Sequence, residues 1–275
     1  MNTFVNNAKT VLLMGAMTGL LVVVGGALGK AFILPFFIMA VVMNVGMWLF
    51  SDKLAIASMR GEEVTEGRLY EMVDRLRRNA GLPMPRVFVC PHQAPNAFAT
   101  GRSPRHAAVA VTQGALQLLS ERELEGVMAH ELAHVKNRDT LTSTIAATIA
   151  GLLAMLAQWG FFLGAGNREN GNPLVMIGVV ILSAVGAAML KAMISRSREF
   201  VADADGARIA GTPEGLMYAL GKLESLNRRI PLQSPNPAQN SMFIVEPFSG
   251  GSMVNRLFAS HPPTEDRLAA LAQLR

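Results

Sequence analysis

His130-Glu131-Leu132-Ala133-His134 is the stretch of this chain that says most about its fold and its chemistry. Two histidines four residues apart project from the same side of a helix, one turn above each other. That spacing lets two imidazoles bind one metal ion. Glu131, between them, is placed to polarise a water molecule at that metal. These five residues therefore predict zinc-dependent hydrolysis of peptide bonds.

The residues around the motif predict a helix independently of it. Ser120 followed by Glu123 is a capping-box start, and acidic residues fill the first turn, where the helix dipole favours them. The apolar residues that repeat at helical spacing are Leu124, Met128, Leu132 and Val135. At 3.6 residues per turn, His130 and His134 lie roughly 140° from this apolar stripe. We therefore expect both imidazoles to face a cleft rather than the core.

A third metal ligand is available further along the chain. Glu199 and Asp203 lie one helical turn apart in the segment Arg198-Glu199-Phe200-Val201-Ala202-Asp203. A catalytic zinc takes three protein ligands and keeps one position for water, so Glu199 completes the set with His130 and His134. Asp203 then orients an imidazole through its second nitrogen. The alternative is a solvated acidic helix face, which would be the better interpretation of these two carboxylates without the histidines.

The composition is unusual for a soluble protein: 51% of residues are hydrophobic, only 16% are charged, and the mean hydropathy is +0.31. Four stretches without charged residues, 11–29, 31–51, 140–167 and 171–190, are each about long enough to cross a bilayer, which takes roughly 20 residues. The first two predict a helical hairpin that turns at Gly29–Lys30. They also follow each other too closely for a cleaved signal peptide. The last two are rich in small residues, and we favour packed membrane helices over buried helices of a soluble fold.

The distribution of basic residues predicts the topology. Lys30 and Arg168 lie on one side of the predicted membrane segments. On the other side lie Lys9, Lys53, Arg60, Lys136, Arg138, Lys191, Arg196 and Arg198. The positive-inside rule therefore places both termini and the metal motif in the cytoplasm, whether or not the second hairpin crosses. The net charge of +5 fits contact with anionic lipid head groups, and no motif for nucleic acid or nucleotide binding is present.

Between the apolar stretches the sequence predicts a small mixed domain. The charged segment 62–79 has a helical apolar stripe and ends at Gly81. Three short strands are expected at 86–90, 96–100 and 107–112, and the single cysteine, Cys90, is expected to be a buried strand thiol. Later helices are expected from Glu199 to Gly211, over 212–226 and after Pro263, with an irregular region at 228–260.

Taken together, these residues resemble the HtpX-type membrane metalloproteases, bacterial relatives of the CAAX prenyl proteases. The resemblance rests on the pentapeptide, on Glu199 with Asp203, and on two shorter segments. Those segments are Ser260-His261-Pro262-Pro263 and Asn96-Ala97-Phe98-Ala99-Thr100-Gly101. They occur in the family's order over essentially the whole chain, which is far more specific than the pentapeptide alone.

The resemblance implies an α+β, mainly helical, zincin-like (gluzincin) fold in the bacterial inner membrane, with a small β-sheet and about four transmembrane helices. Its parts are a membrane hairpin at 1–51, the two halves of a cytoplasmic protease domain at 52–139 and 191–275, and a second apolar hairpin at 140–190. It implies one Zn²⁺ per chain, bound by His130, His134 and Glu199, with Glu131 as the catalytic carboxylate. Asn96 and His261 are then expected near the scissile carbonyl. The implied activity is quality control of membrane proteins.

A peptide substrate is expected to add as a strand beside residues 96–100, so that Ala97 and Phe98 join Asn96 as substrate-binding residues. The oligomeric state stays open, a homo-oligomer included. Two other functions are compatible with a metal motif in a membrane protein. An intramembrane protease of the site-2 type carries its motif within an apolar segment, whereas charged residues flank this one. A non-catalytic zinc-binding scaffold or transporter needs no general base and uses a fourth protein ligand, so Glu131 argues against it.

Overall fold

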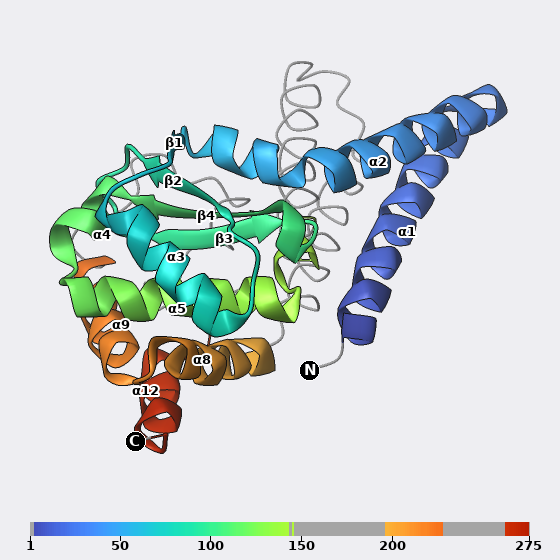
Figure 1. The fold of residues 1–275 in the computed structure, drawn as a ribbon. Helices are drawn as coiled ribbons and strands as arrows, with labels where there is room; N and C mark the ends of the chain where they lie inside the picture. The colour runs from blue at the N-terminus through green and yellow to red at the C-terminus, as the bar shows by residue number, and fades with distance from the viewer. Residues whose placement is uncertain (1–2, 143–144, 146–195, 228–261, 275) are drawn as a thin grey trace, which may run out of the picture.

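The computed structural model describes residues 3–142, 145, 196–227 and 262–274. Nearly all of the predicted second hairpin, the predicted irregular region at 228–260, and His261 lie outside the described residues. The described helices are α1 (Thr3–Leu28), α2 (Ile33–Ser58), α3 (Arg68–Ala80), α4 (Gln113–Leu118), α5 (Glu121–Asn137), α8 (Arg196–Ala210), α9 (Glu214–Asn227) and α12 (Thr264–Ala272). The strands are β1 (Glu62–Val64), β2 (Arg86–Cys90), β3 (Ala97–Gly101) and β4 (Ala107–Thr112). The fold is therefore mainly helical with one small sheet, as expected (Figure 1).

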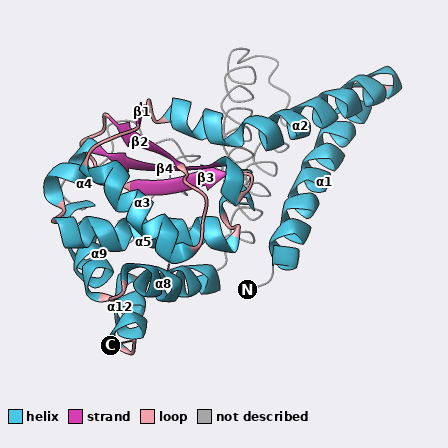
Figure 2. Cartoon of the chain, viewed as in Figure 1, coloured by secondary structure: helices cyan, strands magenta, loops and turns pink. Residues whose placement is uncertain are grey.

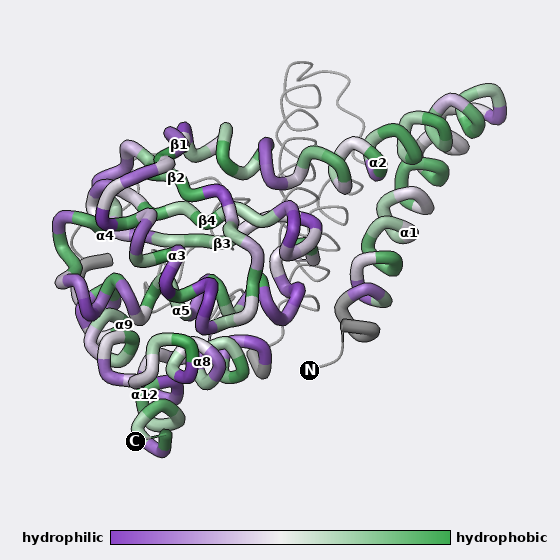
Figure 3. Tube along the Cα trace, in the orientation of Figure 1, coloured by the Kyte–Doolittle hydropathy of each residue, from purple (hydrophilic) through white to green (hydrophobic). Residues whose placement is uncertain are grey.

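Helices α1 and α2 form the predicted N-terminal hairpin, which turns at Gly29 with a φ of 136°. Leu13, Met17 and Leu21 of α1 pack in one cluster with residues of α2, while Leu12, Val42 and other large apolar side chains face outward. Within the described residues, one helical stretch, Lys30–Ser58, is long and apolar enough to cross a membrane. In Figure 3 the residues of these two helices are mostly hydrophobic, whereas hydrophobic and hydrophilic residues alternate along the rest of the described chain. The total of four membrane helices stays a prediction.

The four strands form one sheet in the order β1-β2-β4-β3, in which β2 and β4 are parallel and the two outer strands are antiparallel to their neighbours. The sequence prediction of a helix over 62–79 is wrong in its first third. Residues Glu62–Val64 form β1, with Glu62 opposite Val89, and the helix begins only after Gly67, whose φ is +91°. The local sequence cannot reveal this strand because its pairing partner lies more than twenty residues away.

The two faces of the sheet are covered by different parts of the chain (Figure 2). Val87, Val109 and Val111 pack into the main core together with α3, α5, α8 and α9. Phe88, Phe98 and other residues of the opposite face pack with the end of α2, which runs on to Ser58, beyond the predicted boundary at residue 51. The sheet therefore lies between the C-terminal end of α2 and helix α5, which contains the motif.

Helix α5 lies at the centre of the protein, in contact with α3, β3, β4, α8 and α9. Ser120 and Glu123 form the predicted capping box. The expectation of a helix with one buried stripe is wrong, because residues 126–133 are all buried. Small residues allow this close packing: a Cβ on Gly126 would lie 2.2 Å from the Leu216 backbone nitrogen, and one on Gly215 would lie 2.2 Å from the Arg122 carbonyl oxygen.

We expect Gly126→Ala to destabilise the protein by about 1–3 kcal/mol, because the added methyl group must separate the backbones of α5 and α9. Gly221→Ala is the matched control, since a Cβ at this position of α9 meets nothing within 4 Å. It should raise stability by about 0.5–1 kcal/mol through helix propensity. Thermal unfolding of both full-length variants in detergent measures the difference. Equal melting temperatures would show that the two helices do not depend on this close contact.

Candidate metal centre

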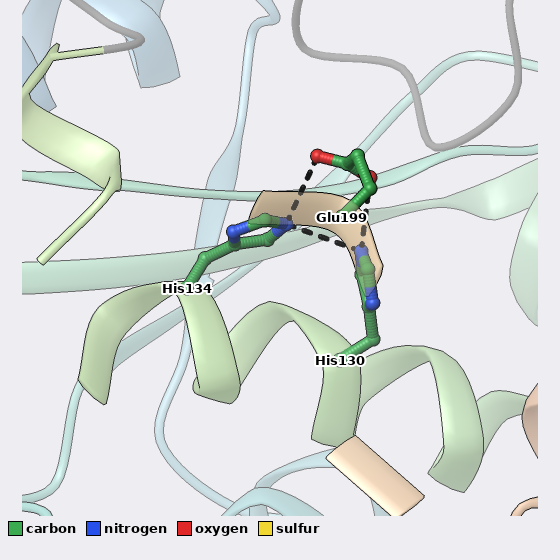
Figure 4. Close-up of side chains that lie close together, drawn as sticks. All are labelled: His130, His134 and Glu199. Carbon is green, nitrogen blue, oxygen red and sulfur yellow. Dashed lines mark hydrogen bonds and ion pairs between the residues drawn. The ribbon is translucent and has the colours of Figure 1, made fainter. Parts of the chain in front are cut away.

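The structure brings His130, His134 and Glu199 together although Glu199 lies on a different helix. The Nε2 atoms of the two histidines are 3.1 Å apart. The carboxylate of Glu199 reaches both, with Oε2 3.7 Å from Nε2 of His130 and Oε1 3.6 Å from Nε2 of His134 (Figure 4). One ligand atom from each residue lies within 4.8 Å of the others, an arrangement that can hold a metal ion.

The distances between these atoms fit a zinc ion. Zinc bonds of about 2.0–2.2 Å that meet at tetrahedral angles place the bound nitrogen and oxygen atoms roughly 3.3–3.6 Å apart. The three observed separations scatter around this value. Two imidazole nitrogens and one carboxylate also form the donor set of known catalytic zinc sites, which keep a fourth position for water.

The buried charges around the site also call for a cation. Four carboxylates in this region are at most 5% exposed, and they belong to Glu131, Asp139, Glu199 and Asp203. Two buried guanidinium groups, those of Arg198 and Arg267, lie among them. With neutral histidines, two negative charges are left over among the described residues. Buried charges are stable only when they are paired or bind a metal, and a divalent cation supplies the missing charge.

Gly206 explains how α8 comes close enough to α5 for this arrangement. A Cβ at this position would lie 2.9 Å from Cα and 3.0 Å from the backbone nitrogen of His130. Only glycine permits this approach without displacing one of the helices. Glu199 and Asp203 lie in the same helix as Gly206, so the contact fixes both carboxylates next to the imidazoles.

Asp203 occupies the orienting position that the sequence predicted. Its Oδ1 lies 2.9 Å from Nδ1 of His130, on the side of the ring opposite the metal-facing nitrogen. Arg267 of α12 donates two hydrogen bonds to the same carboxylate, at 2.6 and 2.8 Å. Burial opposes the charge on Asp203, but the Arg267 guanidinium outweighs it and lowers the pKa of this carboxyl group. Asp203 is therefore a carboxylate that can hold His130 in one orientation.

His134 has a corresponding partner, Asp139, that sequence reasoning did not assign. Arg138 ends α5 in the left-handed conformation with a φ of 58°, and the Asp139 N–H then donates to the His134 carbonyl oxygen at 3.0 Å. This turn brings Oδ2 of Asp139 3.3 Å from Nδ1 of His134. Each metal-facing imidazole thus has a carboxylate on its far nitrogen, as is usual for histidines that bind metals.

The pKa of His134 reflects this surrounding charge. Burial opposes a charged imidazole, but the hydrogen bond with Asp139 and the negative charges of Glu199 and Glu131 outweigh it and raise the pKa to about 9. Without a metal, His134 is therefore protonated at neutral pH. A metal ion must displace this proton in order to bind, because only the neutral imidazole is a ligand.

Glu131 lies between the two histidines on α5 and is 5% exposed. Strand β3, beside the helix, contains Ala97 and Phe98, and Asn96 directly precedes it. The Asn96 backbone is fixed by Thr112, which accepts from the Asn96 N–H through Oγ1 at 2.8 Å and donates its own N–H to the Asn96 carbonyl at 2.9 Å. Ala97 packs in the core with α5, whereas the Phe98 side chain packs on the opposite face with α2. Phe98 can therefore meet a peptide beside β3 only through its main chain.

The sequence analysis gave no role in the site to three charged residues: Asp139, Arg198 and Arg267. Arg267 had a signal, since it lies four residues before Leu271 and so shares the apolar side of its helix. Both side chains are buried, at 1% and 0% exposed. An arginine in an apolar stripe indicates a buried carboxylate partner, but the sequence does not say which one.

Comparison with known proteins gives consistent matches over the whole length. Residues 63–275 match the model of peptidase family M48. A protease HtpX homolog of Desulfatibacillum aliphaticivorans is 50% identical over 98% of this chain and 90% of its own length. One from Nostoc punctiforme is 46% identical over 98% of this chain and 96% of its own. Among solved structures, S. mikatae Ste24p matches with a TM-score of 0.52 at 18% identity. The match covers 98% of this chain and 66% of that one, and it concerns the fold alone.

We expect Arg267→Met to destabilise the protein by about 3–5 kcal/mol, because it leaves the buried Asp203 carboxylate without its cation. Metal affinity should fall by about 10- to 100-fold as His130 loses its fixed orientation. The control is Arg208→Met in α8, whose ion pair with Asp205 is exposed and contributes at most about 1 kcal/mol. Thermal unfolding and a metal titration distinguish the two. Wild-type values for Arg267→Met would contradict the role given to this arginine.

Proposed function

The chain belongs to peptidase family M48 and is a membrane-associated metallopeptidase, and from this premise we propose a more specific function. We propose that it is a multi-pass zinc endopeptidase of the bacterial inner membrane that cleaves misfolded or damaged membrane proteins at the cytoplasmic face. One observation carries the proposal: His130, His134 and Glu199 converge from two helices, with Glu131 in the helical turn between the histidines.

In this mechanism, His130, His134 and Glu199 hold the metal, and Asp203 and Asp139 hold the two imidazoles in place. Zinc bound there supplies a Lewis acid that lowers the pKa of water to about 7. Glu131 acts as general base and takes a proton from the water that attacks the peptide carbonyl. It then returns the proton to the leaving amine nitrogen. His261 is proposed to donate a hydrogen bond to the oxygen of the tetrahedral intermediate.

We propose that the peptide lies along β3, whose one strand partner within the described residues is β4. Helix α5 packs directly against β3, so a chain beside this strand is close to the histidines. Main-chain hydrogen bonds supply much of the affinity in such a mode, which suits unfolded substrates of varied sequence. The inward-facing residues of β3 are small, like Ala97, and leave the sequence of the substrate little restricted.

The contacts of the hairpin support a site near the membrane surface. The hydroxyl oxygens of Thr10, in α1, and Thr142, just after α5, are 3.0 Å apart. The end of α2 packs on the sheet. The peptidase domain therefore lies at the end of the hairpin where α1 starts and α2 stops. Lys9 and Lys53 mark this end, and by the positive-inside rule it is cytoplasmic. Glu121 and Arg122 at the start of α5 are exposed, which does not fit an intramembrane protease of the site-2 type.

We expect Glu131→Gln to abolish cleavage of an unfolded protein substrate while one zinc per chain is retained, because glutamine cannot accept the proton and is not a ligand. A metal chelator should stop the wild-type enzyme, and added zinc should restore it. Product analysis by gel and metal content by mass spectrometry test this. Wild-type turnover by Glu131→Gln would rule out the mechanism. Loss of the metal in this variant would instead make Glu131 a ligand.

Membrane vesicles of known orientation test the proposed topology. A chelator that does not cross membranes should stop cleavage of an added substrate in inside-out vesicles, because the metal centre then faces the medium. Right-side-out vesicles should show no cleavage of this substrate until detergent opens them. Cleavage in intact right-side-out vesicles would place the site on the other face and overturn the cytoplasmic assignment.

A further inference from the structure

A pocket lies beside the C-terminal part of α2, and none of the candidate metal ligands lines it. Its volume is about 450 Å³. Helix α2, the approach to β2, and the turn between β3 and β4 line it. The lining residues that carry the argument are Leu49, Phe50, Lys53, Arg86, Arg102 and Arg105. None of them belongs to the site described above, so the pocket has no role in the proposed mechanism.

The pocket carries a net positive charge. Its lining holds four basic side chains and one carboxylate, Asp52, which pairs with Arg86 at 2.7 Å. Lys53, Arg102 and Arg105 form no ion pair with a carboxylate among the residues that the structure describes. Three cations around one cavity repel each other, and an anion in the cavity relieves this repulsion.

One of these cations is held in place in advance. Arg102 donates from Nη1 to the Leu49 carbonyl oxygen at 2.9 Å, and its guanidinium lies over the Trp48 ring, 5.3 Å from the centroid. A guanidinium fixed in this way loses little conformational freedom when it binds an oxyanion. Arginine is also well suited to phosphate, because its planar fork of donors matches the phosphate oxygens.

The position of the pocket along α2 identifies the source of the anion. Residues 33–50 of this helix rise about 27 Å, close to the thickness of the hydrocarbon core, and carry no charge. Asp52 and Lys53 are the first charged residues after them, and Trp48 next to them is a residue typical of the membrane interface. Leu49 and Phe50 therefore lie at the level of acyl chains, while the three cations lie at the level of head groups.

We propose that this pocket binds the phosphate of an anionic phospholipid in the leaflet next to the peptidase domain. The apolar side of the pocket receives the start of the acyl chains, and Lys53, Arg102 and Arg105 receive the phosphate. The sheet strands that form the pocket also pack on α5, so a bound lipid fixes the peptidase domain against the membrane surface. The proposal rests on the hairpin crossing the bilayer and not on the peptidase activity.

Native mass spectrometry of the full-length protein in detergent tests the proposal with phosphatidylglycerol and phosphatidylcholine of identical acyl chains. We expect one phosphatidylglycerol to bind more tightly than any phosphatidylcholine, and Lys53→Gln and Arg105→Gln each to weaken it about fivefold. The control is Arg208→Gln, which removes the same charge from an exposed pair on α8, on the other side of the sheet, and should change nothing.

Three outcomes would overturn the proposal. The first is equal binding of both lipids, and the second is wild-type affinity for phosphatidylglycerol in the Lys53→Gln, Arg105→Gln double variant. The third is competition by inorganic phosphate at the same concentration as the lipid, which would make the pocket a site for free anions. Chelator-sensitive cleavage by the double variant in detergent is a separate readout. Its loss would show that the double variant is misfolded, and the single variants Lys53→Gln and Arg105→Gln then replace it in the comparison.

Discussion

The close contact between Gly206 and the backbone of His130 is the constraint on which the site depends. It sets the separation of α5 and α8, and this separation decides whether Glu199 reaches the two imidazoles. A side chain at position 206 would push the two helices apart and move Glu199 away from the imidazole nitrogens, which now lie 3.7 and 3.6 Å from its carboxylate oxygens. The glycines between α5 and α9 do the same on another side of the helix, so the metal helix is fixed by backbone contacts.

Such close packing concentrates charge in a region with little water. Asp203 is stabilised by Arg267, and Asp139 lies near Arg198, at 3.7 Å from Nε to Oδ1. After these pairs, the described carboxylates of the site still outnumber its guanidinium groups by two. The hydrogen bond with Asp139 and the nearby negative charges outweigh burial and raise the pKa of His134 to about 9, which favours a proton there when no metal is bound. Metal binding and proton uptake are thus two ways of neutralising the same buried negative charge, and a metal that binds displaces the proton.

The metal centre and the membrane hairpin are linked through the sheet. One face of the sheet packs on α5 and the other on the end of α2. Strands β3 and β4 therefore hold the metal centre at a fixed position relative to the membrane hairpin. The Thr10–Thr142 contact adds a second link, directly after the metal helix. We propose that the substrates are membrane proteins. A site held close to the bilayer surface can then bind a substrate segment where it leaves the bilayer.

The sequence by itself determined most of the local elements and identified the candidate metal ligands. The spacing of His130 and His134, the capping box, and the uncharged stretches depend on neighbouring residues, and local rules describe neighbours well. Tertiary structure alone decided which distant residues meet. The strand at Glu62–Val64, the burial of α5 on all sides, and the roles of Asp139 and Arg267 all depend on partners far away in the chain. The periodicity of apolar residues predicts that a residue is buried, but only the tertiary structure shows which distant residue it contacts.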